Sequence, residues 1–192
     1  MQFHIFLLEG DENLNNFKYL NRQFIISILF IFLFGTLSHF IYNLTGNLAF
    51  IGAFFPVNES IWEHLKLLLI PIISWCIFFY IFNKDKLYMD KDKCFFASII
   101  SLLSSMIFQL SAFYFYTGAF GVESFIIDIL IFLFAVIFGQ FMGLHIYKYN
   151  KGINYKVSFF ILIIIVLFFI YITFNSPHLP IFLDGNTGIY GL

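Results

Sequence analysis

Three of the five histidines in the chain stand near the ends of long apolar segments, where imidazole nitrogens could bind a metal ion. These histidines are His39, His64 and His178. Zn²⁺ is commonly bound by imidazole nitrogen together with a carboxylate oxygen, which Asp184 or Glu63 would supply. Glu59 or the remaining carboxylate would then act as the general base on a metal-bound water. On this first hypothesis the cofactor would be a divalent metal such as zinc, with Glu59 and Glu63 as candidate catalytic groups, although there is no HExxH spacing to specify the metal.

Three further polar residues near the segment ends are candidate binding residues: Asn43, Asn58 and Asp128. Gly35, His39 and Asn43 recur at i, i+4 and i+8, which places both polar side chains on one helix face beside a small residue that permits close packing. Asn58 is an N-cap candidate for the second apolar segment, and Asp128 lies about one turn inside the fourth. The alternative is that all of these residues only cap helix ends or hydrogen-bond to neighbouring loops, without a shared site.

These residues must be positioned by membrane helices, because the composition excludes a water-soluble fold. Hydrophobic residues make up 61% of the chain and charged residues only 11%, too few to cover a surface in water. In lipid, every backbone N–H and C=O must be paired within its own segment, so apolar stretches of about 20 residues form helices. We therefore predict an all-α, polytopic transmembrane helix bundle that forms a single domain over residues 1–192. Its spans, about five in number, are residues 24–44, 65–82, 94–115, 125–146 and 157–174.

The basic residues indicate how the bundle is oriented in the cell membrane. Nine of the ten lysines and arginines fall on one side if the chain crosses five times, and only Lys66 falls on the other. Basic loops stay in the cytoplasm, so the N-terminus is predicted inside and the C-terminus outside. Cys76 and Cys94 border a lysine-rich loop on the cytoplasmic side, where a reducing environment would keep them as thiols. The candidate histidines and carboxylates then lie at the outer face.

Residues 175–192 are predicted to fold back as an outer tail. Residues 179–183 are mostly apolar, unlike a free solvated tail, and residues 184–188, Asp-Gly-Asn-Thr-Gly, favour a turn. Folding back would bury the apolar side chains and bring His178 and Asp184 toward the other candidate residues.

Four stretches of the chain together resemble a known family. They are residues 34–42 (FGTLSHFIY), 56–66 (PVNESIWEHLK), 176–180 (SPHLP) and 187–191 (TGIYG). Through them the chain is similar to a family of small multi-pass membrane proteins from Gram-positive bacteria, a domain of unknown function. In that family a proline often follows the tail aspartate, where this chain has Gly185. The resemblance implies the architecture and no catalytic residues, because no activity is established for the family.

Three classes of function fit these residues. The first is a metal-assisted hydrolase or transferase that acts on a lipid or lipid-linked substrate at the outer leaflet. The second is a small transporter or accessory membrane subunit that binds a cation without catalysis, since an acidic outer face attracts cations. The third is a structural or assembly factor. The expected partners are membrane lipids together with a lipid-linked substrate or a partner membrane protein, and no nucleic acid is expected.

Overall fold

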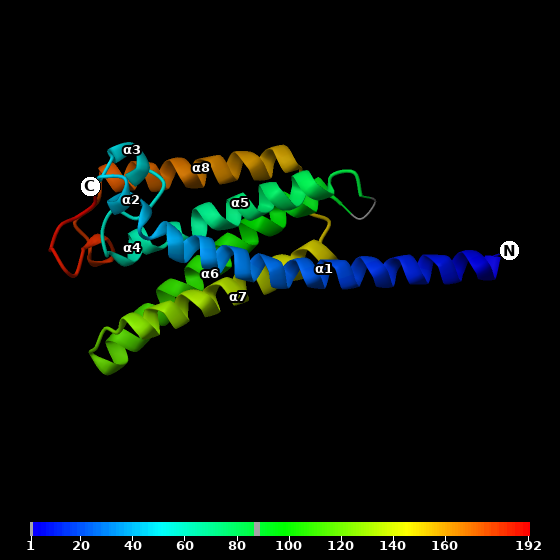
Figure 1. Ribbon diagram of the computed structural model, residues 1–192, viewed down its shortest axis with the longest axis horizontal. Helices are drawn as coiled ribbons and strands as arrows, with labels where there is room; N and C mark the ends of the chain where they lie inside the picture. The colour runs from blue at the N-terminus through cyan, green and yellow to red at the C-terminus, as the bar shows by residue number, and fades with distance from the viewer. Residues whose placement is uncertain (1, 87–88) are drawn as a thin grey trace.

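Five long helices joined by short connections make up the protein, as the computed structural model shows for residues 2–86 and 89–192 (Figure 1). Side chains are described from residue 18 onward, with the same gap. The long helices are α1 (Gln2–Ser38), α5 (Lys66–Asn83), α6 (Lys91–Phe120), α7 (Phe125–Tyr149) and α8 (Tyr155–Phe174). The short helical turns are α2 (Ile41–Leu44), α3 (Ala49–Gly52), α4 (Ile61–His64) and the 3₁₀ turn η1 (Pro180–Phe182). The described residues form no β-strand, only an isolated antiparallel bridge between Leu183 and Tyr190.

Five helical segments are long and apolar enough to cross a membrane. They are Lys18–Ser38, Ile61–Asn83, Lys91–Phe120, Phe125–Tyr149 and Tyr155–Phe174. The prediction of an all-α bundle with five helices that can span a membrane is therefore confirmed. One of these segments combines α4 and α5, because Leu65 keeps right-handed helical geometry between them. Pro71 lies inside α5 without ending it, since α5 continues to Asn83.

The first span differs from its predicted range of residues 24–44, because α1 ends at Ser38. The Ser38 hydroxyl donates to the Gly35 carbonyl oxygen over 2.7 Å, and the chain turns before α2 begins. A serine hydroxyl that binds a nearby backbone carbonyl competes with the helical hydrogen bonds in this way. His39 therefore lies in the turn beyond α1, and Asn43 is an exposed residue of α2.

α6 and α7 form a closely packed hairpin that contains the GxxxG sequence of residues 139–143. A Cβ atom placed on Gly139 would lie 1.8 Å from the Ser105 hydroxyl, and one placed on Gly143 would lie 3.0 Å from Ser101 Cβ. Glycine at position 139 therefore permits α7 to approach α6 this closely. Around the hairpin, α1 packs on α5 and α7, while α8 packs on α6 and α5.

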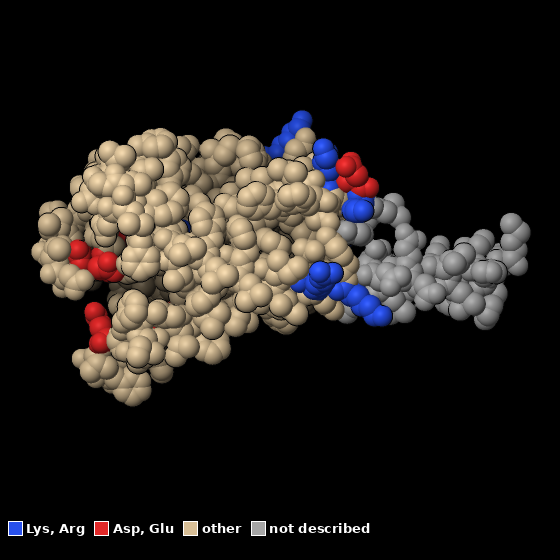
Figure 2. All heavy atoms as spheres, in the orientation of Figure 1, with Lys and Arg blue, Asp and Glu red and all other residues tan. Residues whose placement is uncertain are grey.

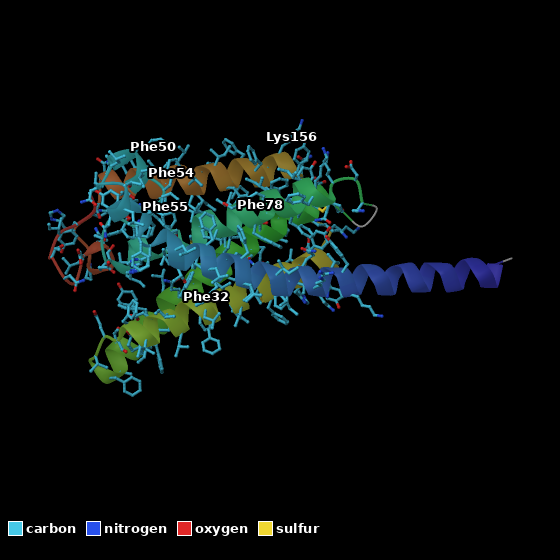
Figure 3. The ribbon with its side chains drawn as sticks, viewed as in Figure 1. Phe32, Phe50, Phe54, Phe55, Phe78 and Lys156 are labelled. Atoms are coloured by element: carbon cyan, nitrogen blue, oxygen red, sulfur yellow. The ribbon has the colours of Figure 1, made fainter. Side chains whose placement is uncertain are left out.

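The two ends of the bundle differ in charge. Figure 2 shows lysine and arginine side chains, with some acidic ones among them, gathered at the end from which α1 projects, and acidic side chains at the opposite end beside a recess in the surface. Figure 3 places Lys156 toward the first end and Phe50, Phe54 and Phe55 toward the second. The second end, which is formed by α2, α3, α4 and residues 175–192, is the site end of the molecule.

Candidate metal centre

Two histidines and one glutamate meet at the site end. His39 Nε2 and His64 Nε2 lie 3.2 Å apart, and Glu59 Oε2 lies 3.4 Å from the first and 3.3 Å from the second. The three donor atoms surround one point, where they could hold a metal ion. These three residues form the His/Glu cluster.

A different element places each residue of the cluster. His39 follows the last residue of α1. Gly35 permits α1 to approach α5 and α7 closely, because a Cβ at this position would lie 2.5 Å from the Phe132 ring and 2.6 Å from a backbone oxygen of α5. Glu59 belongs to the loop before α4, and His64 is the last residue of α4. The cluster therefore depends on how α1 packs against α5 and α7.

Local hydrogen bonds fix α4 to the loop that carries Glu59. Asn58 Oδ1 accepts from Ser60 N at 3.0 Å, and Ser60 Oγ accepts from Glu63 N at 3.3 Å, which caps α4. His64 Nδ1 lies 3.0 Å from the Ser60 carbonyl oxygen. The segment of residues 58–64 thus forms a capped turn that brings Glu59 and His64 together.

The separations of the three donor atoms match one face of a zinc coordination tetrahedron. Zinc binds imidazole nitrogen at about 2.0–2.1 Å and carboxylate oxygen at about 2.0–2.2 Å, so tetrahedral ligands lie about 3.3–3.4 Å from one another. The separations here are 3.2, 3.3 and 3.4 Å. An ion at the central point would lie about 2 Å from all three atoms, with the fourth position left for water or substrate.

The hydrogen bond between His64 and Ser60 explains why a cation suits this point. A carbonyl oxygen can only accept, so His64 Nδ1 carries the proton of this bond. In the neutral imidazole, the lone pair of His64 Nε2 then faces a Glu59 carboxylate oxygen at 3.3 Å. Two acceptors repel each other at that distance unless a proton or a metal ion lies between them. Metal-binding histidines commonly donate their second nitrogen to a backbone carbonyl, as His64 does.

The carboxylate of the cluster is ionised and accessible. When protons rather than a metal ion lie between the three groups, hydrogen bonds from His39 and His64 hold the pKa of the Glu59 carboxyl well below its usual range. The Glu59 side chain is 43% exposed, and each histidine side chain is 24% exposed. An ion held here would therefore have protein ligands on one side and access for water or a substrate on the other.

Glu63, a predicted catalytic group or metal ligand, lies in a separate buried ion pair. Glu63 Oε2 is 2.7 Å from Lys66 Nζ, and the two side chains are almost fully buried. Val57 N donates to Glu63 Oε2 at 3.1 Å, and the Thr173 hydroxyl donates to Glu63 Oε1 at 3.1 Å. Lys66 also donates to the Gly52 carbonyl oxygen at 2.7 Å. The ion pair therefore joins α3, α4, α5 and α8 at the site end.

His178 and Asp184, the predicted metal ligands of the tail, have partners within the tail. The His178 ring stacks on Tyr190 with 4.6 Å between ring centroids. The buried Asp184 carboxylate accepts from Asn186 N at 2.9 Å and from the Thr187 hydroxyl at 2.6 Å. These bonds build the turn of residues 184–188. Neither residue belongs to the group of donor atoms that lie within 4.8 Å of one another around the cluster.

The tail itself folds back onto α4. Phe182 is buried, and its ring centroid lies 5.0 Å from that of Trp62, which stacks on Phe169 of α8 at 4.5 Å. Asn58 Nδ2 donates to the Gly191 carbonyl oxygen at 3.0 Å. Asn58, a predicted binding residue, therefore connects the loop before α4 to the end of the chain.

The other two predicted binding residues have different surroundings. Asn43 is exposed on α2. Asp128 accepts from the Tyr116 hydroxyl at 2.6 Å, and the same hydroxyl accepts from Ser124 N at 3.2 Å. Asp128 thus helps to close the turn between α6 and α7.

Three residues that hold the site in place were not among the residues predicted from the sequence: Ser60, Lys66 and Thr173. Two of them have a local signal. Ser60 and Glu63 show the spacing of a capping box, and Glu63 and Lys66 show that of an i, i+3 ion pair. Thr173 has no such signal, because its contact with Glu63 joins residues 110 positions apart.

Comparison with known proteins places the chain in one family. The model of a family of unknown function, DUF6512, matches residues 13–192. This match covers most of the chain, and the protein therefore belongs to that family. No curated protein matches the chain, and no solved structure matches it.

Proposed function

We propose that this member of a family without an assigned activity is a multi-pass protein of the cell membrane that binds a divalent metal such as zinc. The ligands are His39, Glu59 and His64, and the bound metal assists hydrolysis or group transfer on a lipid or lipid-linked substrate. The supporting observation is the mutual spacing of 3.2 to 3.4 Å among three donor atoms, which fits zinc with one position open.

The ligand set favours catalysis over a purely structural metal site. Structural zinc sites are usually closed by four protein ligands, whereas catalytic sites have three protein ligands and a water, and two histidines with one glutamate is a known catalytic set. A zinc-bound water loses a proton near neutral pH and becomes a nucleophile. The partial exposure of the cluster leaves room for such a water and for the group that it attacks.

The position of the cluster supports a substrate at the membrane surface. His39 and His64 lie at the ends of candidate spans, at the acidic end of the bundle, and the positive-inside rule assigns that end to the outer leaflet. Lys66 is the cation described at the site end, and its ammonium group is buried against Glu63. The metal alone would therefore have to neutralise the negative charge of a phosphate group, so a neutral ester or amide carbonyl fits the site better.

Hydrolysis by the purified protein tests this proposal. Protein in detergent is loaded with zinc and assayed with fluorogenic esters and amides of long-chain fatty acids. We expect turnover that disappears on chelation, returns with zinc, and is lost in the Glu59→Gln and His64→Ala variants. The matched variant Glu123→Gln, which changes an exposed carboxylate elsewhere at this end, should retain activity. A protein that binds zinc stoichiometrically but hydrolyses none of these substrates would contradict the catalytic part of the proposal.

Cation transport is a second candidate function, because buried polar groups extend into the middle of the bundle. Gln140 Nε2 donates to Ser101 Oγ at 2.6 Å between α7 and α6. Farther along α6, Ser105 Oγ and Gln109 Oε1 are buried without a hydrogen-bond partner in the described structure. Zinc uptake into liposomes that contain the protein would favour transport. Liposomes that stay impermeable to zinc while the protein shows zinc-dependent hydrolysis would favour the enzyme.

A further inference from the structure

Two free cysteines face each other inside the bundle, away from the His/Glu cluster. Cys76 of α5 and Cys94 of α6 are 2% and 4% exposed, and their sulfur atoms lie 3.9 Å apart. Cys76 lies 12 residues beyond His64 along α4 and α5, which corresponds to about 18 Å of helix. The thiol pair is therefore a separate feature that the proposed function does not use.

The thiol pair borders a cavity that can hold small polar ligands. A cavity of about 80 Å³ lies among α1, α5, α6 and α7, and both cysteines line it. Its wall also includes polar side chains, among them Ser98, Ser101 and Gln140. A water needs about 10–15 Å³ of such space and two or more polar partners, so the cavity has room for an ion with water ligands.

We propose that Cys76 and Cys94 form a second metal site, which takes a divalent thiophilic cation of the zinc and cadmium class. Thiolates are soft ligands that select such ions, with zinc–sulfur bonds of about 2.3 Å. Two sulfur atoms 3.9 Å apart are each 2.3 Å from a common point at a bond angle of roughly 115°, near the tetrahedral value. Water in the cavity completes the coordination.

Charge balance selects a divalent ion for this site. Each thiol loses one proton as it binds, so two thiols and one M²⁺ give a neutral M(S–Cys)₂ unit and two released protons. A neutral unit suits the interior of a membrane bundle, where an uncompensated charge is costly. The bound ion links α5 to α6 at the level of the cavity.

Cadmium absorption separates this site from the His/Glu cluster. Cd²⁺ is titrated into the His39→Ala/His64→Ala protein while the sulfur-to-cadmium charge-transfer band in the ultraviolet is recorded. We expect a band that saturates at one cadmium per chain and disappears in Cys76→Ser and in Cys94→Ser on the same background. Ser104→Ala, a matched change on α6 outside the cavity wall, should retain the band.

Proton release provides a second measurement that needs no cysteine substitution. In weakly buffered solution, the His39→Ala/His64→Ala protein should release about two protons for each cadmium ion that it binds. Absence of the band in folded protein, or a band that persists in both serine variants, would overturn the proposal, as would cadmium binding without proton release. None of these results depends on zinc at the His/Glu cluster, so the two proposals can fail separately.

Discussion

In the proposed site His39 and His64 share one ion, and removing either imidazole would leave it with a single imidazole and one exposed carboxylate. We therefore expect His39→Ala or His64→Ala alone to lower zinc binding about as much as the double variant, since ligands of one ion act as a unit. Zinc content after dialysis, measured on a Cys76→Ser/Cys94→Ser background, gives the comparison. His178→Ala is the matched control and should retain zinc. Partial losses that add in the double variant would contradict a shared site.

The sequence indicates the residue types of the site but not which carboxylate meets the histidines. Glu59 and Glu63 stand one helical turn apart, and both precede the same apolar segment. Their separation in the fold depends on Lys66, which pairs with Glu63, and on Thr173, which reaches Glu63 from α8. A contact between residues so far apart in the chain leaves no local pattern in a single sequence.

At the scale of the elements, the Glu63–Lys66 ion pair anchors α4 and α5 to their surroundings. Glu63→Gln leaves a buried ammonium group without its counter-ion, and breaking a buried pair in this way costs about 3–5 kcal/mol of stability. We expect a lower melting temperature, which tryptophan fluorescence measures for the protein in detergent. Glu63→Gln/Lys66→Met should recover part of the loss, and Glu123→Gln, at an exposed position, should change little. An unchanged melting temperature in Glu63→Gln would show that the pair contributes no stability.

Aromatic contact helps to hold the tail on α4. Trp62→Ala removes the ring that packs against Phe182, so chymotrypsin should cut after Phe182 and Leu183 faster than in the unmodified protein. Trp75→Ala is a suitable control, because Trp75 packs against Phe79 within the bundle. Rapid cleavage at these sites in the unmodified protein would show that the tail does not stay docked in solution.

The long helices follow from the sequence, whereas the end of α1 does not. Apolar segments of about 20 residues specify spans almost independently of their neighbours, because lipid leaves the backbone no other partners. The end of α1 is set by competition between hydrogen bonds at Ser38, in a stretch that stays mostly apolar to Leu44. Hydropathy alone therefore extends the first span past the end of α1 and places Asn43 in that span, whereas the structure has it in α2.

At the scale of the whole molecule, the separation of charge predicts the orientation. We expect an impermeant maleimide to label Asn186→Cys in intact cells and to spare Lys91→Cys, since the positive-inside rule assigns the lysine-bearing end to the cytoplasm. Both positions are exposed, and the native cysteines are buried, so background labelling should be low. The opposite labelling would place the His/Glu cluster in the cytoplasm and exclude an outer-leaflet substrate.

Zinc X-ray absorption of the Cys76→Ser/Cys94→Ser protein tests most directly whether His39, Glu59 and His64 hold a metal. The account predicts one zinc per chain, bound by nitrogen and oxygen at about 2.0–2.1 Å, with the outer-shell scattering of two imidazoles. That scattering should be lost together with the zinc in His64→Ala. A folded protein that retains no zinc, or that holds zinc without imidazole scattering, would contradict the account.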